Sequence, residues 1–130
     1  MLDLKQKLLD VAELSSSNKR KVGAILVCPN GIVYQGYNHI GYDKTKECEI
    51  DNVTLDSVVH AEEDVILQAA KDGSATNGAW LYITHSPCEH CANLIIKAGI
   101  TVVSYIEEYK SIKGLEILNI SGINVKKLKK

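Results

Sequence analysis

The order of the expected helices and strands constrains the fold of this chain more than any other feature of its sequence. Residues 22–28 and 32–37 are rich in β-forming side chains and flank Pro29-Asn30-Gly31. Asn-Gly between two such runs is a strong hairpin signal, because both positions of a two-residue hairpin turn take positive φ angles. We therefore expect the sheet to begin with two antiparallel strands.

Helices and strands alternate along the second half of the chain. A polar segment over 38–59 predicts a long loop, which in a compact domain is often functional. The elements expected after it are a helix over 60–71, a strand over 80–84, a helix over 87–99, a strand over 100–105, a helix over 111–121 and a short strand over 123–126. Together with an amphipathic helix within 3–14, this alternation predicts an α/β fold, a three-layer α-β-α arrangement with a mixed five-stranded sheet.

Length and composition suit one domain over residues 1–130. No apolar run reaches eighteen residues, so nothing is expected to span a membrane. The first residues lack the layout of a secretory signal, and the four cysteines do not form a disulfide framework. A cytoplasmic location is the resulting prediction.

The charge is distributed unevenly. Four of the fifteen basic residues are lysines between 126 and 130, so residues 1–125 carry eleven basic and sixteen acidic side chains. An acidic body binds polyanions poorly, because nucleic-acid affinity depends on neutralising phosphates. We expect a small-molecule substrate and no long nucleic acid, and a frayed, flexible basic tail over about 126–130.

Two short segments carry the residues that point to chemistry. His60-Ala61-Glu62 and Pro87-Cys88-Glu89-His90-Cys91 each fall where a helix is expected to begin. Cysteines at i and i+3 of a first helical turn point the same way, and the free N–H groups there favour the thiolate that binds metal. Two thiolates and one imidazole leave a fourth tetrahedral position open for water. The sequence thus predicts one catalytic Zn²⁺ held by His60, Cys88 and Cys91.

Glu62 has the position for proton transfer beside such a metal. Zinc lowers the pKa of bound water from about 9 towards roughly 7, which makes hydroxide available at neutral pH. Attack of hydroxide on C4 of a cytosine ring needs a proton moved to ring N3 and later to the departing amine. His-x-Glu with Pro-Cys-x-x-Cys is the general signature of zinc deaminases, in which the Glu is the acid/base and not a ligand.

Each part alone has a plainer interpretation. A lone Cys-x-x-Cys is more often a redox pair or half of a zinc knuckle, but no thioredoxin-type pattern or second cysteine pair is present. His60 alone is more often a polar residue at a helix start, and His90 is expected to point away from the metal. Catalysis is favoured because both segments occur together, about one helix and one strand apart.

Longer stretches of the sequence resemble one family. The matching segments are 60–67 (HAEEDVIL), 82–91 (YITHSPCEHC), 22–25, 36–38, 98–100 and 105–109. These segments look like those of the deoxycytidylate (dCMP) deaminases, within the zinc-dependent cytidine and deoxycytidylate deaminase family. The resemblance implies the cytidine-deaminase-like fold, conversion of dCMP to dUMP and ammonia, and a homo-oligomer, commonly a hexamer.

The resemblance also implies substrate contacts. The family's zinc ligands and proton shuttle fall on the four residues given above. Asn38 matches an asparagine that contacts the sugar, the backbone of Ala61 would meet the pyrimidine edge, and Tyr109 matches a tyrosine near the substrate. Asn38 alone could equally be a turn residue at a strand end. Arg20, just before the first strand, is a candidate to grip a 5′-phosphate bidentately, with a solvated turn as the alternative.

The chain departs from the family at several positions. His39-Ile40-Gly41 follows Asn38 where a Gly-rich loop is usual, Asp64 replaces an asparagine, and His85 replaces an apolar residue. Some relatives hold a second zinc, for which Cys48 with His39 or Glu49 would be the candidates here; we expect one catalytic ion and no second structural ion.

Two other functions compete with this hypothesis. The first is deamination of free cytidine, deoxycytidine or another cytosine-type substrate, including a base in RNA, which the acidic body disfavours. The second is a zinc-stabilised binding domain without catalysis. That domain would tolerate Glu62→Gln, whereas a deaminase would not.

Overall fold

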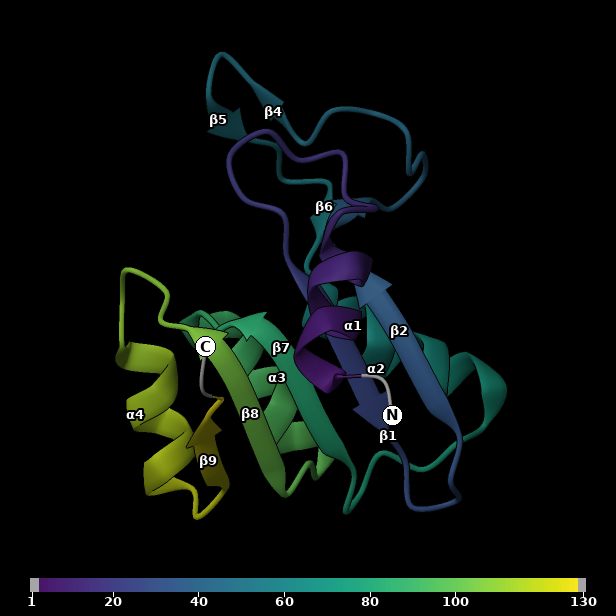
Figure 1. The fold of residues 1–130 in the computed structure, drawn as a ribbon, viewed down its shortest axis with the longest axis vertical. Coiled ribbons are helices and arrows are strands. Elements are labelled where there is room, and N and C mark those ends of the chain that lie inside the picture. The colour runs from purple at the N-terminus through teal and green to yellow at the C-terminus, as the bar shows by residue number, and fades with distance from the viewer. Residues whose placement is uncertain (1–2, 129–130) are drawn as a thin grey trace.

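A computed structural model describes residues 3–128 as a twisted β-sheet with helices on both faces (Figure 1). The main elements are α1 (Leu4–Ala12), β1 (Gly23–Val27), β2 (Val33–Tyr37), α2 (Ala61–Asp72), β7 (Trp80–His85), α3 (Glu89–Ala98), β8 (Val102–Glu107), α4 (Lys113–Ile120) and β9 (Asn124–Lys127). The sheet order is β2-β1-β7-β8-β9, with β1 antiparallel to both of its neighbours and β7, β8 and β9 parallel to one another. The expected mixed five-stranded sheet is confirmed.

The two faces of the sheet are covered unequally. Alternate residues of β1, Ala24 and Leu26, belong to the large core that contains Val65 of α2, Ile95 of α3 and Leu118 of α4. The opposite face carries a small cluster in which Leu8 of α1 packs with Ile25 and Ile106. Strand side chains alternate between faces, so each strand contributes to both layers. Three helices therefore cover one face and α1 alone packs on the other.

The hairpin between β1 and β2 forms, but its turn differs from the prediction. Only Gly31 has a positive φ, of 88°, and Asn30 does not. The Gly31 N–H donates to the Cys28 carbonyl, and the Cys28 N–H donates to the Ile32 carbonyl. This is a type I turn followed by a left-handed glycine, and Pro29 favours it because proline fixes the φ that the first central position of such a turn requires.

The polar 38–59 segment contains short strands instead of a plain loop. The strands are β3 (His39–Ile40), β4 (Glu49–Ile50), β5 (Val53–Thr54) and β6 (Val58–Val59). They pair as β3 with β6 and β4 with β5, and Figure 1 shows the segment projecting beyond the main sheet. Asp51 and Asn52, with φ of 50° and 64°, form the two-residue turn with positive φ at both positions that was expected at Asn30-Gly31.

Two boundaries near the C-terminus also differ. β8 begins two residues later than expected, because Gly99 ends α3 in the left-handed conformation and the Ile100 N–H still donates to the Ile95 carbonyl. Lys126 and Lys127 belong to β9, which corrects the expectation of a frayed end starting at 126. Leu128 follows β9 and is described, whereas residues 129–130 of that expected tail lie outside the described residues. Within residues 3–128, no helix is both long and apolar enough to cross a membrane.

Helices α2 and α3 begin at the same edge of the sheet. α2 leads into β7 through a short connection, and α3 leaves β7 at its other end. Each helix runs back against the strand, so both N-termini lie at the carboxyl-terminal edge of β7. In α/β sheets this edge is where ligands bind.

Candidate metal centre and substrate cavity

His60 is placed by the start of α2. It is the N-cap residue, with extended backbone angles (φ −71°, ψ 155°), and its N–H donates to the Glu63 carboxylate at 3.1 Å. Glu62, Glu63 and Asp64 all lie in the first turn, where negative charge complements the helix dipole. This capping arrangement holds the His60 backbone in place and leaves its imidazole free to point towards α3.

Cys88 and Cys91 are placed by the start of α3. Cys88 is the N-cap, and its Sγ accepts a hydrogen bond from the Cys91 N–H at 3.5 Å. The buried Pro87 precedes it at the end of the connection from β7. A free N–H aimed at a sulfur favours the thiolate. The first turn of α3 therefore presents two sulfurs to the same point.

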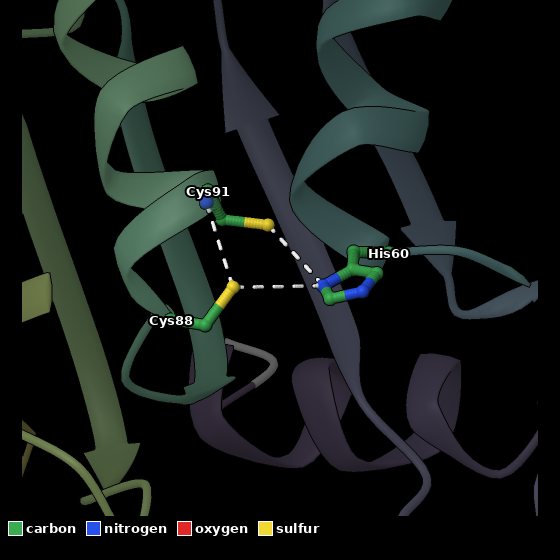
Figure 2. A group of neighbouring side chains, drawn as sticks. All are labelled: His60, Cys88 and Cys91. Atoms are coloured by element: carbon green, nitrogen blue, oxygen red, sulfur yellow. Dashed lines mark hydrogen bonds between the residues drawn. The ribbon is translucent and has the colours of Figure 1, made fainter. Parts of the chain in front are cut away.

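The three side chains converge (Figure 2). Nδ1 of His60 lies 3.3 Å from Sγ of Cys91 and 3.9 Å from Sγ of Cys88, and all three ligand atoms lie within 4.8 Å of one another. Tetrahedral zinc with ordinary Zn–S and Zn–N bonds separates such atoms by roughly 3.5–3.8 Å. The donor set and the spacing both fit Zn²⁺. Among the described residues, these form the one group of three or more possible ligands.

Protonation of the three groups is strongly coupled. Hydrogen bonds from Cys91 and His60 outweigh the effect of burial and lower the pKa of the Cys88 thiol to about 3. The Cys88 sulfur in turn raises the pKa of His60 to about 9, while the Cys91 thiol has a raised pKa because it shares its hydrogen with Cys88 and is buried. A metal must displace these protons, so we expect binding to release protons.

Glu62 lies buried beside this cluster, with 4% of its surface exposed. Burial raises the pKa of its carboxyl group to about 7, against the opposing effect of its own backbone N–H and of His60. A carboxyl group with a pKa near the operating pH can both accept and return a proton. The spacing of the sequence motif predicted that Glu62 lies beside the cluster, and the structure shows in addition that its carboxyl group is buried away from solvent.

A cavity of about 210 Å³ opens above the cluster. The cavity is lined by seven of the eight residues that the sequence singled out, which are Arg20, Asn38, His60, Ala61, Glu62, Cys88 and Tyr109. Cys91, the eighth, is fully buried behind the lining and contacts His60. The structure thus brings together residues that are up to 89 positions apart in the chain.

Asn38 has a structural role in this cavity. Its Nδ2 donates to the Arg20 carbonyl at 2.8 Å and its Oδ1 accepts from the Val22 N–H at 2.9 Å. The carboxamide thereby fixes the segment that enters β1. A carboxamide has two donor hydrogens and two acceptor lone pairs, so one of each remains for a ligand.

Arg20 and Tyr109 lie against each other in the lining of the cavity. The guanidinium carbon of Arg20 is 4.8 Å from the centroid of the Tyr109 ring. The Tyr109 N–H donates to Ser86 Oγ at 2.7 Å, which ties this residue to the segment before Cys88. Stacking on the ring holds the guanidinium plane in place at little entropic cost.

Other members of the lining were not predicted from the sequence. Glu49 was considered only as a possible second-zinc ligand, but its buried carboxylate accepts from the Ser17 hydroxyl at 2.6 Å and the Asn18 N–H at 2.9 Å. Lys110 lines the cavity directly after Tyr109, and His85 lines it at the end of β7. Of these three residues, Glu49 and His85 each carried a signal in the sequence, and Lys110 carried none.

Comparison with known proteins is consistent with this geometry. Over 95% of this chain and 93% of the other, the fold superimposes on the crystal structure of a dCMP deaminase from cyanophage S-TIM5 in complex with dCMP and dUMP, with a TM-score of 0.88 and 32% identity. The chain is 38% identical to ComE operon protein 2 of Bacillus subtilis over 75% of its own length and 53% of that protein. It is 39% identical to the deoxycytidylate deaminase of Enterobacteria phage T4 over 54% of its own length and 42% of that protein. The chain therefore spans about half the length of these two curated relatives.

The mixed sheet and the histidine–cysteine cluster at two helix starts define the class as that of the cytidine-deaminase-like α/β proteins. The sequence model described as the cytidine and deoxycytidylate deaminase zinc-binding region matches residues 2–107. The chain belongs to the cytidine and deoxycytidylate deaminase zinc-binding family.

Proposed function

We propose that this protein is a zinc-dependent deaminase that hydrolyses dCMP to dUMP and ammonia. The observation that carries the proposal is the burial of Glu62 beside three residues whose spacing fits zinc, in the lining of a cavity that also contains Lys19, Arg20 and Lys110. Family membership and the superimposed dCMP deaminase support the same substrate.

The proposed roles follow from the positions of the groups. His60, Cys88 and Cys91 would hold the ion, which when bound supplies a Lewis acid that lowers the pKa of a water molecule towards neutrality. Glu62 takes a proton from the attacking water, passes it to ring N3 and later protonates the departing amine. In the net reaction a C4–O bond forms and the C4–N4 bond breaks.

The remaining cavity residues would bind and orient the nucleotide. The backbone at Ala61 faces the pyrimidine edge, and Asn38 contacts the sugar through its unused donor and acceptor. Arg20, held against Tyr109, contacts the 5′-phosphate. We also propose that the whole chain acts as one domain with one ion, in the cytoplasm, and that it assembles as a homo-oligomer, with a hexamer favoured.

A substrate panel tests the nucleotide assignment. With zinc-loaded protein and ammonia release as the measurement, we expect kcat/KM for dCMP to exceed that for deoxycytidine by at least about tenfold to hundredfold, because a charge-assisted contact contributes roughly 1.5–3 kcal/mol. Arg20→Gln should remove most of this preference while leaving turnover of deoxycytidine nearly unchanged. Equal turnover of both substrates by the wild-type protein would contradict the assignment and favour a nucleoside deaminase.

Gly114 of α4 offers a test of the metal centre from a neighbouring helix. A Cβ atom on Gly114 would overlap the Pro87 carbonyl oxygen and lie 3.0 Å from the Cys88 carbonyl oxygen. Gly114→Ala should therefore push the backbone that places Cys88 and lower zinc affinity by about tenfold to hundredfold, as changes that misplace metal ligands do.

The matched control is Asn119→Ala, an exposed position on the same helix. In the absence of any overlap, replacing glycine by alanine inside a helix stabilises it by about 1 kcal/mol. A Gly114→Ala protein that is more stable than the wild type and binds zinc with unchanged affinity would therefore contradict the close approach of Gly114 to the Pro87 carbonyl. Competition with a chromogenic chelator measures the affinity, and thermal unfolding measures the stability.

A further inference from the structure

His85 occupies the cavity wall without a part in the reaction proposed above. It is the last residue of β7, and 20% of its side chain is exposed. In the parallel register of β7 and β8 it lies beside Glu107.

Polar groups face both nitrogens of the His85 ring. The Gly23 N–H donates to Thr84 Oγ1 at 3.1 Å, and this oxygen, which lies 2.9 Å from His85 Nδ1, keeps a second lone pair that can accept from a protonated ring. Nε2, on the other side of the ring, lies 3.4 Å from a Glu107 carboxylate oxygen. A second proton on the ring would therefore form a charge that Glu107 already faces.

The charges around His85 come from several elements. Burial and the positive charge of Arg20 lower the pKa of His85, and Glu107 opposes them. The same cavity holds Lys19, from the segment before β1, and Lys110, which follows β8. The other titratable groups in the lining are Cys48, Glu49, His60, Glu62, Cys88 and Tyr109.

We propose that His85 is a specificity-determining residue for a nucleotide monophosphate. A 5′-phosphate bound beside Arg20 offsets the positive charge of that guanidinium, so that His85 takes up a proton from solvent and adds a further cation to a lining that already holds Lys19, Arg20 and Lys110. The proposal deepens the function proposed above and rests on it, because it requires a phosphorylated substrate.

The sign of the pH dependence follows from linkage. A proton that binds together with the nucleotide makes nucleotide affinity fall as pH rises above neutrality. For each unit by which the bound phosphate raises the pKa of His85, the affinity for the nucleotide can change by about tenfold between low and high pH. A nucleoside without phosphate does not offset the charge of Arg20, so its binding takes up no proton at His85.

Isothermal titration tests the proposal with zinc-loaded protein and the non-reacting ligands dUMP and deoxyuridine. Titrations near pH 7.5 in two buffers of different ionisation enthalpy give the number of protons taken up. We expect net uptake when dUMP binds to the wild-type protein, and none with deoxyuridine. His85→Gln should abolish the uptake and raise the KM for dCMP about tenfold near pH 6.5, with little change for deoxycytidine.

Two further variants distinguish charge from structure. His85→Lys carries a permanent charge and should restore a low KM for dCMP without proton uptake. His90→Gln changes an exposed histidine outside the cavity lining and should behave as the wild type. Equal uptake in the wild type and His85→Gln, with a strong preference for dCMP retained, would overturn this inference and leave the proposed function standing. A wild-type enzyme that does not prefer dCMP would instead remove the proposed function itself.

Discussion

Glu62→Gln is expected to keep its zinc and to lose turnover of dCMP by a factor of about 10²–10⁴, the range for removing a general acid–base group. Glutamine has nearly the same shape as glutamate and fills the same buried space, so the fold and the three metal ligands should be undisturbed. It cannot accept and return a proton, which is the role that burial and a pKa of about 7 suit in Glu62. Metal analysis and ammonia release on the same preparation measure the two properties together.

Asp64→Asn is the matched control for this substitution. It removes one negative charge from the same first turn of α2, at a residue that does not line the cavity. The carboxamide oxygen that replaces the carboxylate can still accept the hydrogen bond that the Tyr37 N–H donates to Asp64. We expect the kcat of this variant to stay within a few-fold of the wild type. Full turnover of dCMP in Glu62→Gln would contradict the role of Glu62 as the proton carrier, whereas a zinc-loaded wild-type protein that releases no ammonia would support a zinc-stabilised binding domain and end the deaminase hypothesis.

The cluster of His60, Cys88 and Cys91 was predictable from sequence because its geometry is local. Cys88 and Cys91 are held by one helical turn, and His60 precedes another, so spacing alone fixes how each side chain points. The mixed sheet was likewise predictable, since a hairpin followed by alternating helices and strands allows few arrangements. The resemblance to the dCMP deaminases, confirmed by the family match, covered the same segments.

The rest of the cavity depends on contacts that no local pattern encodes. Glu49 reaches Ser17 and Asn18 across more than thirty residues, from a segment whose short strands have no sequence periodicity. Asn38 donates to the Arg20 carbonyl and accepts from the Val22 N–H, and both hydrogen bonds depend on tertiary position. At the first hairpin, the residue before Asn-Gly decided the turn: proline favoured a type I turn, and the sequence rule for Asn-Gly pairs did not account for it.

Cys88→Ala is expected to lose zinc, activity and part of the stability together. Two ligands cannot hold zinc as three do, and turnover should fall to background. An ion that binds only the folded state contributes about 4 kcal/mol when its free concentration exceeds Kd a thousandfold, which corresponds to a fall of roughly ten degrees or more in Tm. The decisive measurement is Tm with and without a strong chelator: chelation should destabilise the wild-type protein and leave Cys88→Ala unchanged.

Cys28→Ala serves as the control for loss of a thiol. Cys28 is buried in the same core but lies just after the end of β1, which pairs with the first residues of β7 and so lies at the sheet edge opposite the cluster. The Cys28→Ala protein should bind one zinc per chain, keep its activity and still lose stability on chelation. The deleted sulfur itself should cost only a small part of the stability. If the Cys88→Ala protein still bound one zinc per chain and its Tm fell on chelation, the ion would have to lie outside the cluster of His60, Cys88 and Cys91. Glu62 can carry protons for the reaction only if the zinc-bound water lies beside it. The proposed role of Glu62 would then be wrong together with the proposed zinc site.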